Sequence, residues 1–325
     1  MEKKELFPGL PPYKDPTRGL LSKLPPPWIP YGQLMRLDRP GGFYAYYFPY
    51  LIGFTYASCI APTPLEPKFL LRWALVLLPF SLLLRGVACT WNDTVDQKFD
   101  RCVRRTCHRP VARGAVTTTQ GHLFTLIQAI LLYIVVINLG VSSTCILHTT
   151  VTVVLFCVYA LMKRITYYPE VVLGVPFAWA IFFSVAALGM EPLDAHIVWS
   201  TVSMFGSNAL WTVTYSVIYS HQDIADDEAA GVKNMAVRFK NGTKPLVGLL
   251  TFAQVALLAV CGLWAGFGPL YYIGSVGGVA AAMAYYIYDV DLGKPESCFA
   301  WFGYQFWTVG GAYMLGLAGE LLRRM

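Results

Sequence analysis

The sequence predicts an all-α integral membrane protein with about nine transmembrane helices, and three observations lead to this prediction. Of the 325 residues, 56% are hydrophobic and only 14% are charged, whereas a soluble domain carries about 25% charged residues. The mean hydropathy is +0.49. Apolar runs recur from residue 43 almost to the end, and each is close to the ~20 residues that a helix needs to cross a bilayer.

The apolar runs are separated by short polar segments, so each is interpreted as one membrane span. The predicted spans cover residues 43–61, 69–91, 120–140, 142–162, 170–190, 196–219, 244–265, 268–289 and 299–321. Together they account for most of the chain, and residues 43–325 are therefore interpreted as one transmembrane domain. This composition excludes a soluble disulfide-stapled fold and a nucleic-acid-binding module.

Residues 1–42 form a polar, proline-rich segment that precedes the first span. The segment has no long apolar run of the kind found in a cleaved secretory signal. A mitochondrial presequence is Arg- and Ser-rich and poor in acids, but this segment contains Glu2, Glu5 and Asp15 and a single serine. We therefore predict insertion through an uncleaved first span, into the endoplasmic reticulum or Golgi.

The distribution of basic residues predicts the orientation of the chain. The N-terminal segment and the loops after spans two, four, six and eight lie on one side and carry most of the 25 lysines and arginines. The opposite side carries Lys68, Arg72, Arg323 and Arg324. Because basic loops remain in the cytosol, the N-terminus and the even-numbered loops are predicted to face the cytosol.

Acidic residues are few, and they collect after two of the spans. Asn92, Asp96 and Asp100 are spaced at i, i+4 and i+8 after span two. A second group at i, i+3 and i+4 follows span six and consists of Asp223, Asp226 and Asp227. On a helix, each spacing places its members on one face. Asp93 points off the first of these faces.

Aligned carboxylates at a helix end repel one another, and a divalent cation removes this repulsion. Mg²⁺ is usually held by one or two carboxylates together with phosphate oxygens of the substrate. Both groups follow even-numbered spans, so they face the same side of the membrane. Two metal-carboxylate groups opposite each other, with basic loops between them, predict a site that clamps a diphosphate.

The ordered motifs resemble those of the membrane aromatic prenyltransferases of the UbiA type. Their two signatures are an N-D-x-x-D-x-x-x-D segment and a later D-x-x-D/D-D segment. The resemblance covers most of the chain and extends to four further stretches. These are Leu34-Met35-Arg36-Leu37-Asp38-Arg39-Pro40, Arg109-Pro110 with Gly114, Lys163-Arg164-Ile165-Thr166, and Trp211-Thr212-x-x-Tyr215 ahead of Tyr219-x-His221-Gln222-Asp223.

The resemblance implies a nine-helix bundle around a central cavity, in which a polyprenyl diphosphate prenylates a phenolic aromatic acceptor. Asn92, Asp96 and Asp100 would bind one Mg²⁺, and Asp223 and Asp227 would bind a second. Asp226 would assist them. The residues implied in holding the diphosphate or an acceptor carboxylate are Arg36, Lys163, Arg164 and Lys233. The aromatic faces that could shelter the allylic cation are Trp91, Trp211, Tyr215 and Tyr219, and His221 is one option for the base.

Two departures from the signatures bear on the acceptor. The enzymes that prenylate 4-hydroxybenzoate for ubiquinone carry an Asp after the motif tyrosine and a Lys-Arg pair in the second signature. This chain has Ser216 at the first position and Ile224 with Ala225 at the second. The chain is therefore more similar to the fungal meroterpenoid branch, in which farnesyl is transferred to a phenolic polyketide such as an orsellinic-acid-type ring.

Two alternatives remain at this point. One is a 4-hydroxybenzoate polyprenyltransferase of ubiquinone biosynthesis. The other is a transporter, since intramembrane charges such as Arg85 also mark ion pathways. A transporter is expected to place its acids near the midplane, whereas these acids lie at span ends. The predicted partners are the diphosphate donor, the phenolic acceptor and the lipid bilayer, with no obligate protein partner evident.

Overall fold

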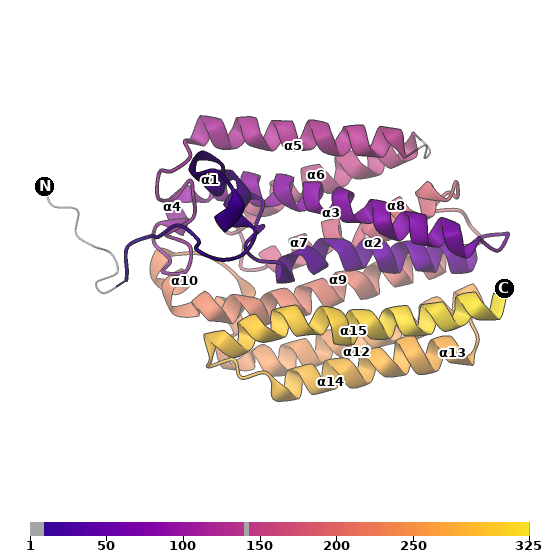
Figure 1. Ribbon diagram of the computed structural model, residues 1–325. Coiled ribbons are helices and arrows are strands. Elements are labelled where there is room, and N and C mark those ends of the chain that lie inside the picture. The colour runs from indigo at the N-terminus through magenta and orange to yellow at the C-terminus, as the bar shows by residue number, and fades with distance from the viewer. Residues whose placement is uncertain (1–9, 140–142, 325) are drawn as a thin grey trace, which may run out of the picture.

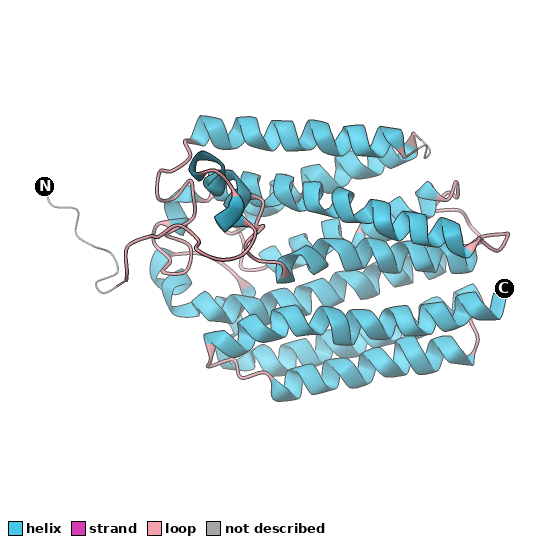
Figure 2. Ribbon diagram, viewed as in Figure 1, coloured by secondary structure: helices cyan, strands magenta, loops and turns pink. Residues whose placement is uncertain are grey.

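In the computed structural model, the described residues are 10–139 and 143–324, and they contain helices and loops but no strand (Figure 2). The long helices lie side by side along one common direction (Figure 1). Their bounds are α2 (Gly41–Ile60), α3 (Pro67–Val95), α5 (Thr118–Asn138), α6 (Thr144–Met162), α7 (Pro169–Ala178), α8 (Ala180–Ala187), α9 (Val198–Ser220), α12 (Thr243–Ala265), α14 (Gly278–Asp289) and α15 (Pro295–Arg324). Residues 1–9 of the predicted N-terminal segment, and residues 140 and 142 at the ends of two predicted spans, lie outside the described part.

Each predicted span coincides with a helical segment, which confirms the all-α membrane fold. The fifth span consists of α7 and α8, and the eighth consists of α13 (Pro269–Tyr271), the π-helical η5 (Tyr272–Gly277) and α14. Among the described residues, six helical segments are long and apolar enough to cross a membrane by length and composition. Helices α2, α9 and α15 match the other three spans in position only, so nine crossings stay a prediction.

The outer faces of the bundle are apolar, as expected for contact with lipid. Leu123, Ile130 and Ile137 on α5, and Phe252 and Leu263 on α12, are each about half exposed or more. Exposed apolar patches of this extent are unusual on a soluble monomer. In a bilayer these side chains contact acyl chains, while the helical hydrogen bonds satisfy the backbone.

The helices close into a ring through successive contacts. Helix α2 packs on α3, α8 and α15, while α9 packs on α7, α12 and α15. Glycine allows the closest of these approaches. A Cβ atom at Gly274 of η5 would lie 2.6 Å from Cα of Gly316 of α15, so these two segments meet backbone to backbone.

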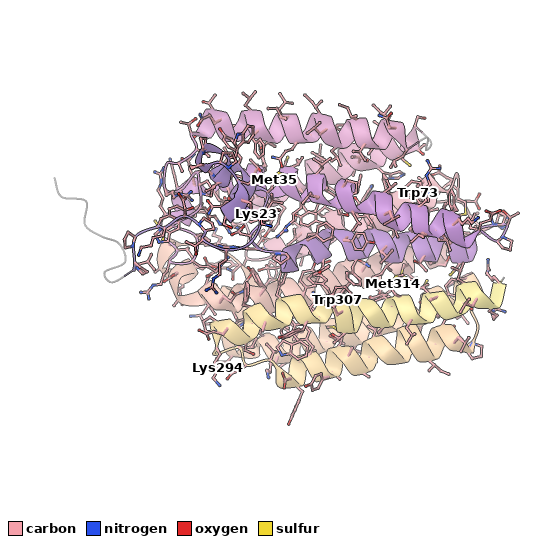
Figure 3. The ribbon with its side chains drawn as sticks, viewed as in Figure 1. Lys23, Met35, Trp73, Lys294, Trp307 and Met314 are labelled. Atoms are coloured by element: carbon pink, nitrogen blue, oxygen red, sulfur yellow. The ribbon has the colours of Figure 1, made fainter. Side chains whose placement is uncertain are left out.

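The short helices and their loops gather at one end of the bundle, where the chain first enters it (Figure 1). They are α1 (Ile29–Leu34), α4 (Gln97–Asp100), η3 (His221–Asp223), α10 (Ile224–Ala230) and α11 (Met235–Phe239). Lys23 and Lys294 lie toward this end, and Trp73 lies toward the other (Figure 3). Residues 10–40 and the loops after α3 and α9 therefore share one end, as the charge pattern predicts.

Candidate active site

A cavity of about 790 Å³ opens among α2, α3, α6, α7, α9 and α15 at this end of the bundle. Its mouth is lined by the charged groups that follow α3 and α9. Deeper walls are apolar and aromatic, and they include Phe156, Phe177, Tyr215 and Phe302. The cavity therefore joins a charged mouth to an apolar interior.

All three predicted residues of the first signature line this cavity. Helix α3 ends at Val95, and α4 continues it after Asp96. The turn is preserved across the junction, because the Asp96 amide donates to the Asn92 carbonyl (2.8 Å) and the Asp100 amide donates to the Asp96 carbonyl (2.9 Å). The predicted i, i+4, i+8 alignment therefore holds although α3 and α4 are separate helices.

Each carboxylate of this segment faces a basic side chain. Oxygens of Asp96 lie 3.1 Å from Nζ of Lys163 and 3.0 Å from Nη2 of Arg164. Nη1 of Arg109 lies 3.0 Å from both carboxylate oxygens of Asp100. Burial raises the pKa of Asp100 although Arg109 opposes the shift. Burial alone would lower the pKa of Lys163, but Asp96 outweighs it and the pKa is raised.

Asp93, which points off the signature face, holds two arginines. Its Oδ1 lies 2.5 Å from Nη2 of Arg36 and 3.0 Å from Nη1 of Arg109. The Asp93 side chain is fully buried. For both arginines, burial alone would lower the pKa, but the neighbouring carboxylates outweigh it and the pKa is raised. Asp93 thus keeps two cations charged beside the signature carboxylates.

The acidic residues of the second signature lie partly in the cavity lining and partly outside it. Asp223 and Asp227 line the cavity. Asp223 accepts from Nε of Arg105 at 2.9 Å and from Nη2 at 2.5 Å. Asp227 accepts from the Asn234 amide at 2.8 Å. Burial, with the adjacent charge of Asp223, raises the pKa of Asp227 to about 6.

Three of the predicted metal-binding or diphosphate-binding residues do not line the cavity. Asp226 accepts the backbone N–H of Arg104 at 2.8 Å, so it fixes the loop after α4. Arg164 contacts Asp96, the carbonyl of Val95 and the ring of Phe99. Lys233 lies over the Tyr167 ring, 5.8 Å from its centroid. Arg36 and Lys163, by contrast, do line the cavity as expected.

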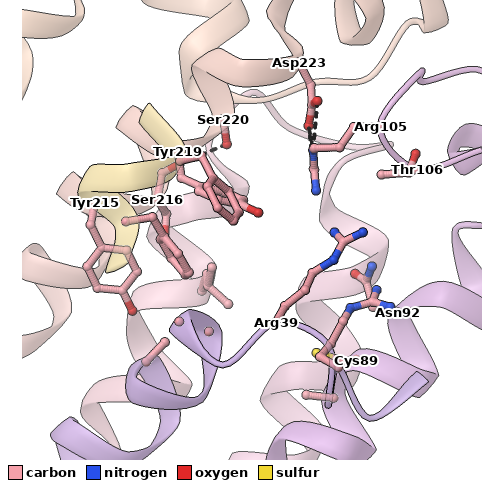
Figure 4. A pocket seen from close by; sticks show the side chains of 18 of the residues that line it. Arg39, Cys89, Asn92, Arg105, Thr106, Tyr215, Ser216, Tyr219, Ser220 and Asp223 are labelled. Carbon is pink, nitrogen blue, oxygen red and sulfur yellow. Dashed lines mark hydrogen bonds and ion pairs between the residues drawn. The ribbon is translucent and has the colours of Figure 1, made fainter. Parts of the chain in front are cut away.

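The aromatic candidates divide in the same way. Tyr215 and Tyr219 line the cavity from α9, whereas Trp91 and Trp211 are not among the residues that line it. The ring centroids of Tyr219 and Phe302 lie 4.3 Å apart. In Figure 4, Tyr215, Ser216, Tyr219 and Ser220 lie on one side of the cavity, across from Arg39 and Asn92, and Arg105 meets Asp223.

His221, the option for a base, also lies outside the cavity lining. It is 7% exposed, and its Nε2 lies 2.9 Å from the Thr243 hydroxyl. Burial lowers the pKa of its imidazole. The structure therefore places His221 in a packing contact between the end of α9 and the start of α12.

Residues 36–40 bring two arginines to the cavity through a backbone arrangement that the sequence did not predict. Arg36 has a left-handed φ of 58°. The guanidinium of Arg85 donates to the carbonyl oxygens of Arg36 at 3.1 Å and Arg39 at 2.6 Å. Gly42 leaves room for it, because a Cβ there would lie 2.7 Å from Nη2 of Arg85.

Arg39 lines the cavity, and its positive charge has only a weak acidic partner. Burial lowers the pKa of Arg39, and the charge of Arg36 adds to this effect. Its contact with Asp38 is long, 3.4 Å from Nε. Sequence reasoning missed Arg39 and Arg105 as site residues. The signal available for Arg39 was its position in the stretch that resembles the family.

Glu170 is a further cavity residue that the sequence reasoning missed. It lies in the first turn of α7 and is 3% exposed. Its carboxylate accepts the Met235 amide at 3.1 and 3.3 Å. The Ser220 hydroxyl lies 3.5 Å away. Acidic spacing could not have found it, because it stands alone in the sequence.

The donor set at the mouth fits Mg²⁺ held together with a phosphate-bearing ligand. Oδ1 of Asn92 is buried and makes no hydrogen bond to any described residue. Within the described residues, no three His, Cys, Asp or Glu converge as a ready-made metal cage. Mg²⁺ is usually held by one or two carboxylates together with phosphate oxygens of the substrate, and the unpartnered Asn92 oxygen beside Asp96 and Asp100 suits such a site.

Comparison with known proteins shows the family. The model of the UbiA prenyltransferase family matches residues 46–310. The prenyltransferase ascA of Acremonium egyptiacum is 41% identical over 278 residues, which cover 86% of this chain and 82% of that protein. The DMOA farnesyltransferase nvfB of Aspergillus novofumigatus is 35% identical over 288 residues, with coverage of 86% and 88%.

A mitochondrial relative and a solved structure complete the comparison. The mitochondrial 4-hydroxybenzoate polyprenyltransferase of Schizosaccharomyces pombe is 34% identical over 304 residues, covering 90% of this chain and 79% of that protein. A UbiA homologue from Archaeoglobus fulgidus, bound to GPP and Mg²⁺, superposes with a TM-score of 0.67 at 16% identity, covering 90% and 99% of the two chains. The chain therefore belongs to the UbiA prenyltransferase family and is a multi-pass membrane prenyltransferase.

Proposed function

We propose that the protein transfers a polyprenyl group, farnesyl, from its diphosphate to a ring carbon of a phenolic polyketide acid of the orsellinic type. The reaction would depend on Mg²⁺ and would belong to meroterpenoid secondary metabolism. The observation that carries the proposal is the juxtaposition of the Asn92–Asp100 segment with Asp223 and Asp227 at the mouth of an apolar cavity.

The charged mouth suits a diphosphate that leaves with an electron pair. In this role Asn92, Asp96 and Asp100 would hold one Mg²⁺, and Asp223 and Asp227 the second. Bound Mg²⁺ would neutralise the negative charge that develops on the departing diphosphate. Arg36, Arg39 and Lys163 would contact the diphosphate oxygens directly, which is electrostatic catalysis without a covalent intermediate.

The ion pairs at the mouth of the cavity support this assignment. Lys163 with Asp96, and Arg105 with Asp223, are pairs that neutralise each other across the mouth. A diphosphate and divalent cations can replace these pairs with a larger set of opposite charges. Asp226 and Lys233, which lie outside the cavity lining, are assigned supporting roles in the loops, and Arg164 orients Asp96.

The apolar interior suits an allylic chain and its cation. Phe156, Phe177 and Phe302 exclude water from the reacting carbon, and aromatic faces stabilise cationic charge. Tyr215 and Tyr219 line the same cavity from α9. They are assigned to shelter C1 of the donor as its bond to oxygen breaks.

The acceptor and donor are assigned from the names of the relatives and from the positions at which this chain differs from the 4-hydroxybenzoate enzymes. The name of nvfB specifies a farnesyltransferase, and ascA is a fungal prenyltransferase. Ser216 stands where the 4-hydroxybenzoate enzymes are expected to carry an Asp, and it lines the cavity. A hydroxyl there suits an acceptor with additional ring hydroxyls.

A 4-hydroxybenzoate polyprenyltransferase is the second candidate, favoured by the S. pombe relative. Its activity would place the protein in ubiquinone biosynthesis and in mitochondria. The membrane of the endoplasmic reticulum or Golgi is proposed as the location instead. The basic end of the bundle, which carries the site, is proposed to face the cytosol.

A microsomal assay tests the proposal. Membranes containing the protein receive Mg²⁺, farnesyl diphosphate and, in separate tubes, orsellinic acid and 4-hydroxybenzoate, and mass spectrometry detects an added C15 unit. C-farnesylated orsellinate that disappears with EDTA supports the proposal. Product from 4-hydroxybenzoate alone would move the protein to quinone biosynthesis.

A further inference from the structure

Glu170 is a buried carboxylate in the cavity that belongs to neither metal signature. It lines the cavity at the first turn of α7 and is 3% exposed. Among the described residues it makes no ion pair, whereas Asp96, Asp100 and Asp223 each pair with a basic side chain. A buried charge without a counterion is unfavourable, so a purely packing role would be served better by an uncharged residue.

The known contacts of Glu170 leave part of its hydrogen-bonding capacity unused. The Met235 amide donates to it, and the Ser220 hydroxyl lies at the long distance of 3.5 Å. An ionised carboxylate offers about four acceptor positions. Glu170 can therefore accept a further hydrogen bond from a molecule in the cavity.

The surroundings of Glu170 suit a hydroxylated ring beside the diphosphate. Leu173 and Phe177, one and two turns further along α7, contribute apolar wall, and Ser216 and Tyr219 contribute hydroxyls from α9 (Figure 4). Glu170 also lies within electrostatic range of Lys163. Lys163 pairs with Asp96, and Glu170 lines the same cavity as the predicted diphosphate position.

We propose that Glu170 is the general base that accepts the phenolic proton of the acceptor during prenyl transfer. This inference rests on the proposed function. It adds a catalytic group to the site, since the carboxylate would contact the acceptor hydroxyl. It also accounts for a choice among acceptors, because only a ring with a free hydroxyl at that position can donate to Glu170.

The proton and electron balance is complete with the two substrates. The phenolic proton moves to Glu170 while the ring carbon bonds to C1 of the prenyl group. The C1–O bond breaks, and its electron pair leaves with the diphosphate. The resulting dienone loses its ring C–H proton to a diphosphate oxygen, and Glu170 returns its proton to the ring oxygen, which restores the phenol.

The test uses the purified full-length protein in nanodiscs with Mg²⁺, labelled farnesyl diphosphate and orsellinic acid. Two products are measured: farnesyl orsellinate, and the farnesol released when water captures the donor without acceptor. For Glu170→Gln, we expect farnesyl orsellinate to fall about 100-fold, the contribution typical of a general base. Farnesol release should stay near the wild-type rate, because donor cleavage does not use Glu170.

Two further variants serve as controls. Glu170→Asp keeps a carboxylate and should recover part of the lost transfer. Glu191→Gln makes the same chemical change at an exposed position in the α8–α9 connection and should transfer at the wild-type rate. If Glu170→Gln keeps near-wild-type transfer, or loses transfer and farnesol release in parallel, the base assignment is overturned.

A measurement on the wild-type protein does not depend on any variant folding. The two monomethyl ethers of orsellinic acid each lack one phenolic proton. We expect one ether to lose prenyl transfer and the other to keep it. If both ethers were converted at the same rate as orsellinic acid, the inference would be overturned. Wild-type protein that makes no farnesyl orsellinate at all would instead overturn the proposed function, and with it this inference.

Discussion

Arg105, in the loop after α4, lies against Asp223 at the end of η3, with Nη2 2.5 Å from Oδ2. One guanidinium thus joins the loop of the first signature to the carboxylate of the second. Arg109, from the same loop, pairs with Asp100 and Asp93. Asp96, Asp100 and Asp223, three of the acids that are predicted to hold metal, are therefore each paired with a basic side chain of the protein itself.

This pairing predicts that metal removal stops the reaction without unfolding the protein. In EDTA, prenyl transfer should fall to background, while the Tm should change by no more than a few degrees because the arginine and lysine pairs persist. Added Mg²⁺ should restore transfer. The measurement is thermal unfolding and turnover of the same detergent-solubilised sample.

Mg²⁺ is expected to stabilise the fold only when the diphosphate is also bound. Since no three acidic groups of the described part form a cage, Mg²⁺ alone should raise the Tm little, and Mg²⁺ with farnesyl diphosphate should raise it clearly by binding linkage. A large rise with Mg²⁺ alone would contradict the shared protein–diphosphate site.

Asp96→Asn should abolish turnover, because it removes a charged oxygen ligand and leaves Lys163 and Arg164 unpaired. We expect a loss of at least about 100-fold, the scale found when one group that stabilises transition-state charge is removed. The matched control is Asp226→Asn, whose oxygen can still accept from the Arg104 amide. It should keep most of the activity.

Product formation per amount of protein in the membrane fraction is the measurement for this pair. Near-wild-type turnover by Asp96→Asn would remove Asp96 from the metal site. Equal losses in both variants would show that Asp226 also acts on the metal, as the spacing of the second signature first suggested.

The sequence predicted the helices and the acidic signatures because both depend on local patterns. Apolar runs and i, i+4 spacing are properties of neighbouring residues. They were therefore sufficient to predict the positions of α3 and α9 and the placement of Asp96 and Asp223 at one end of the bundle. The observed helix ends differ from the predicted span ends by several residues. Helix α3, for example, continues beyond its apolar run to Val95, and α4 follows it from Gln97 to Asp100.

The remaining site residues depend on contacts between distant segments. Arg105 reaches Asp223 across 118 positions, and Arg85 fixes the carbonyl of Arg39 across 46. No spacing rule connects such pairs. Glu170 was missed for the same reason, because its role depends on the cavity and not on its sequence neighbours.

Lys163→Ala should weaken use of the donor. The ammonium lies 3.1 Å from Asp96 and lines the cavity, so its loss should raise the KM for farnesyl diphosphate by about 10-fold, equivalent to ~1.4 kcal/mol. The control is Lys233→Ala, which removes a lysine stacked on Tyr167 outside the cavity. Its KM for the donor should stay near wild type. Unchanged KM and kcat in Lys163→Ala would exclude Lys163 from the diphosphate site.

Gly274→Ala should destabilise the bundle without altering the site. Its Cβ would lie 2.6 Å from Cα of Gly316, and because this neighbour is backbone, η5 and α15 must separate. Overpacking of this kind costs about 1–3 kcal/mol. Gly311→Ala is the control on α15, since its added Cβ would meet no described atom within 4 Å apart from the neighbouring backbone of its own helix. Thermal unfolding in detergent should show a lower Tm for Gly274→Ala alone, with the KM for the donor unchanged in both. An unaltered Tm in Gly274→Ala would mean that these two segments do not meet backbone to backbone.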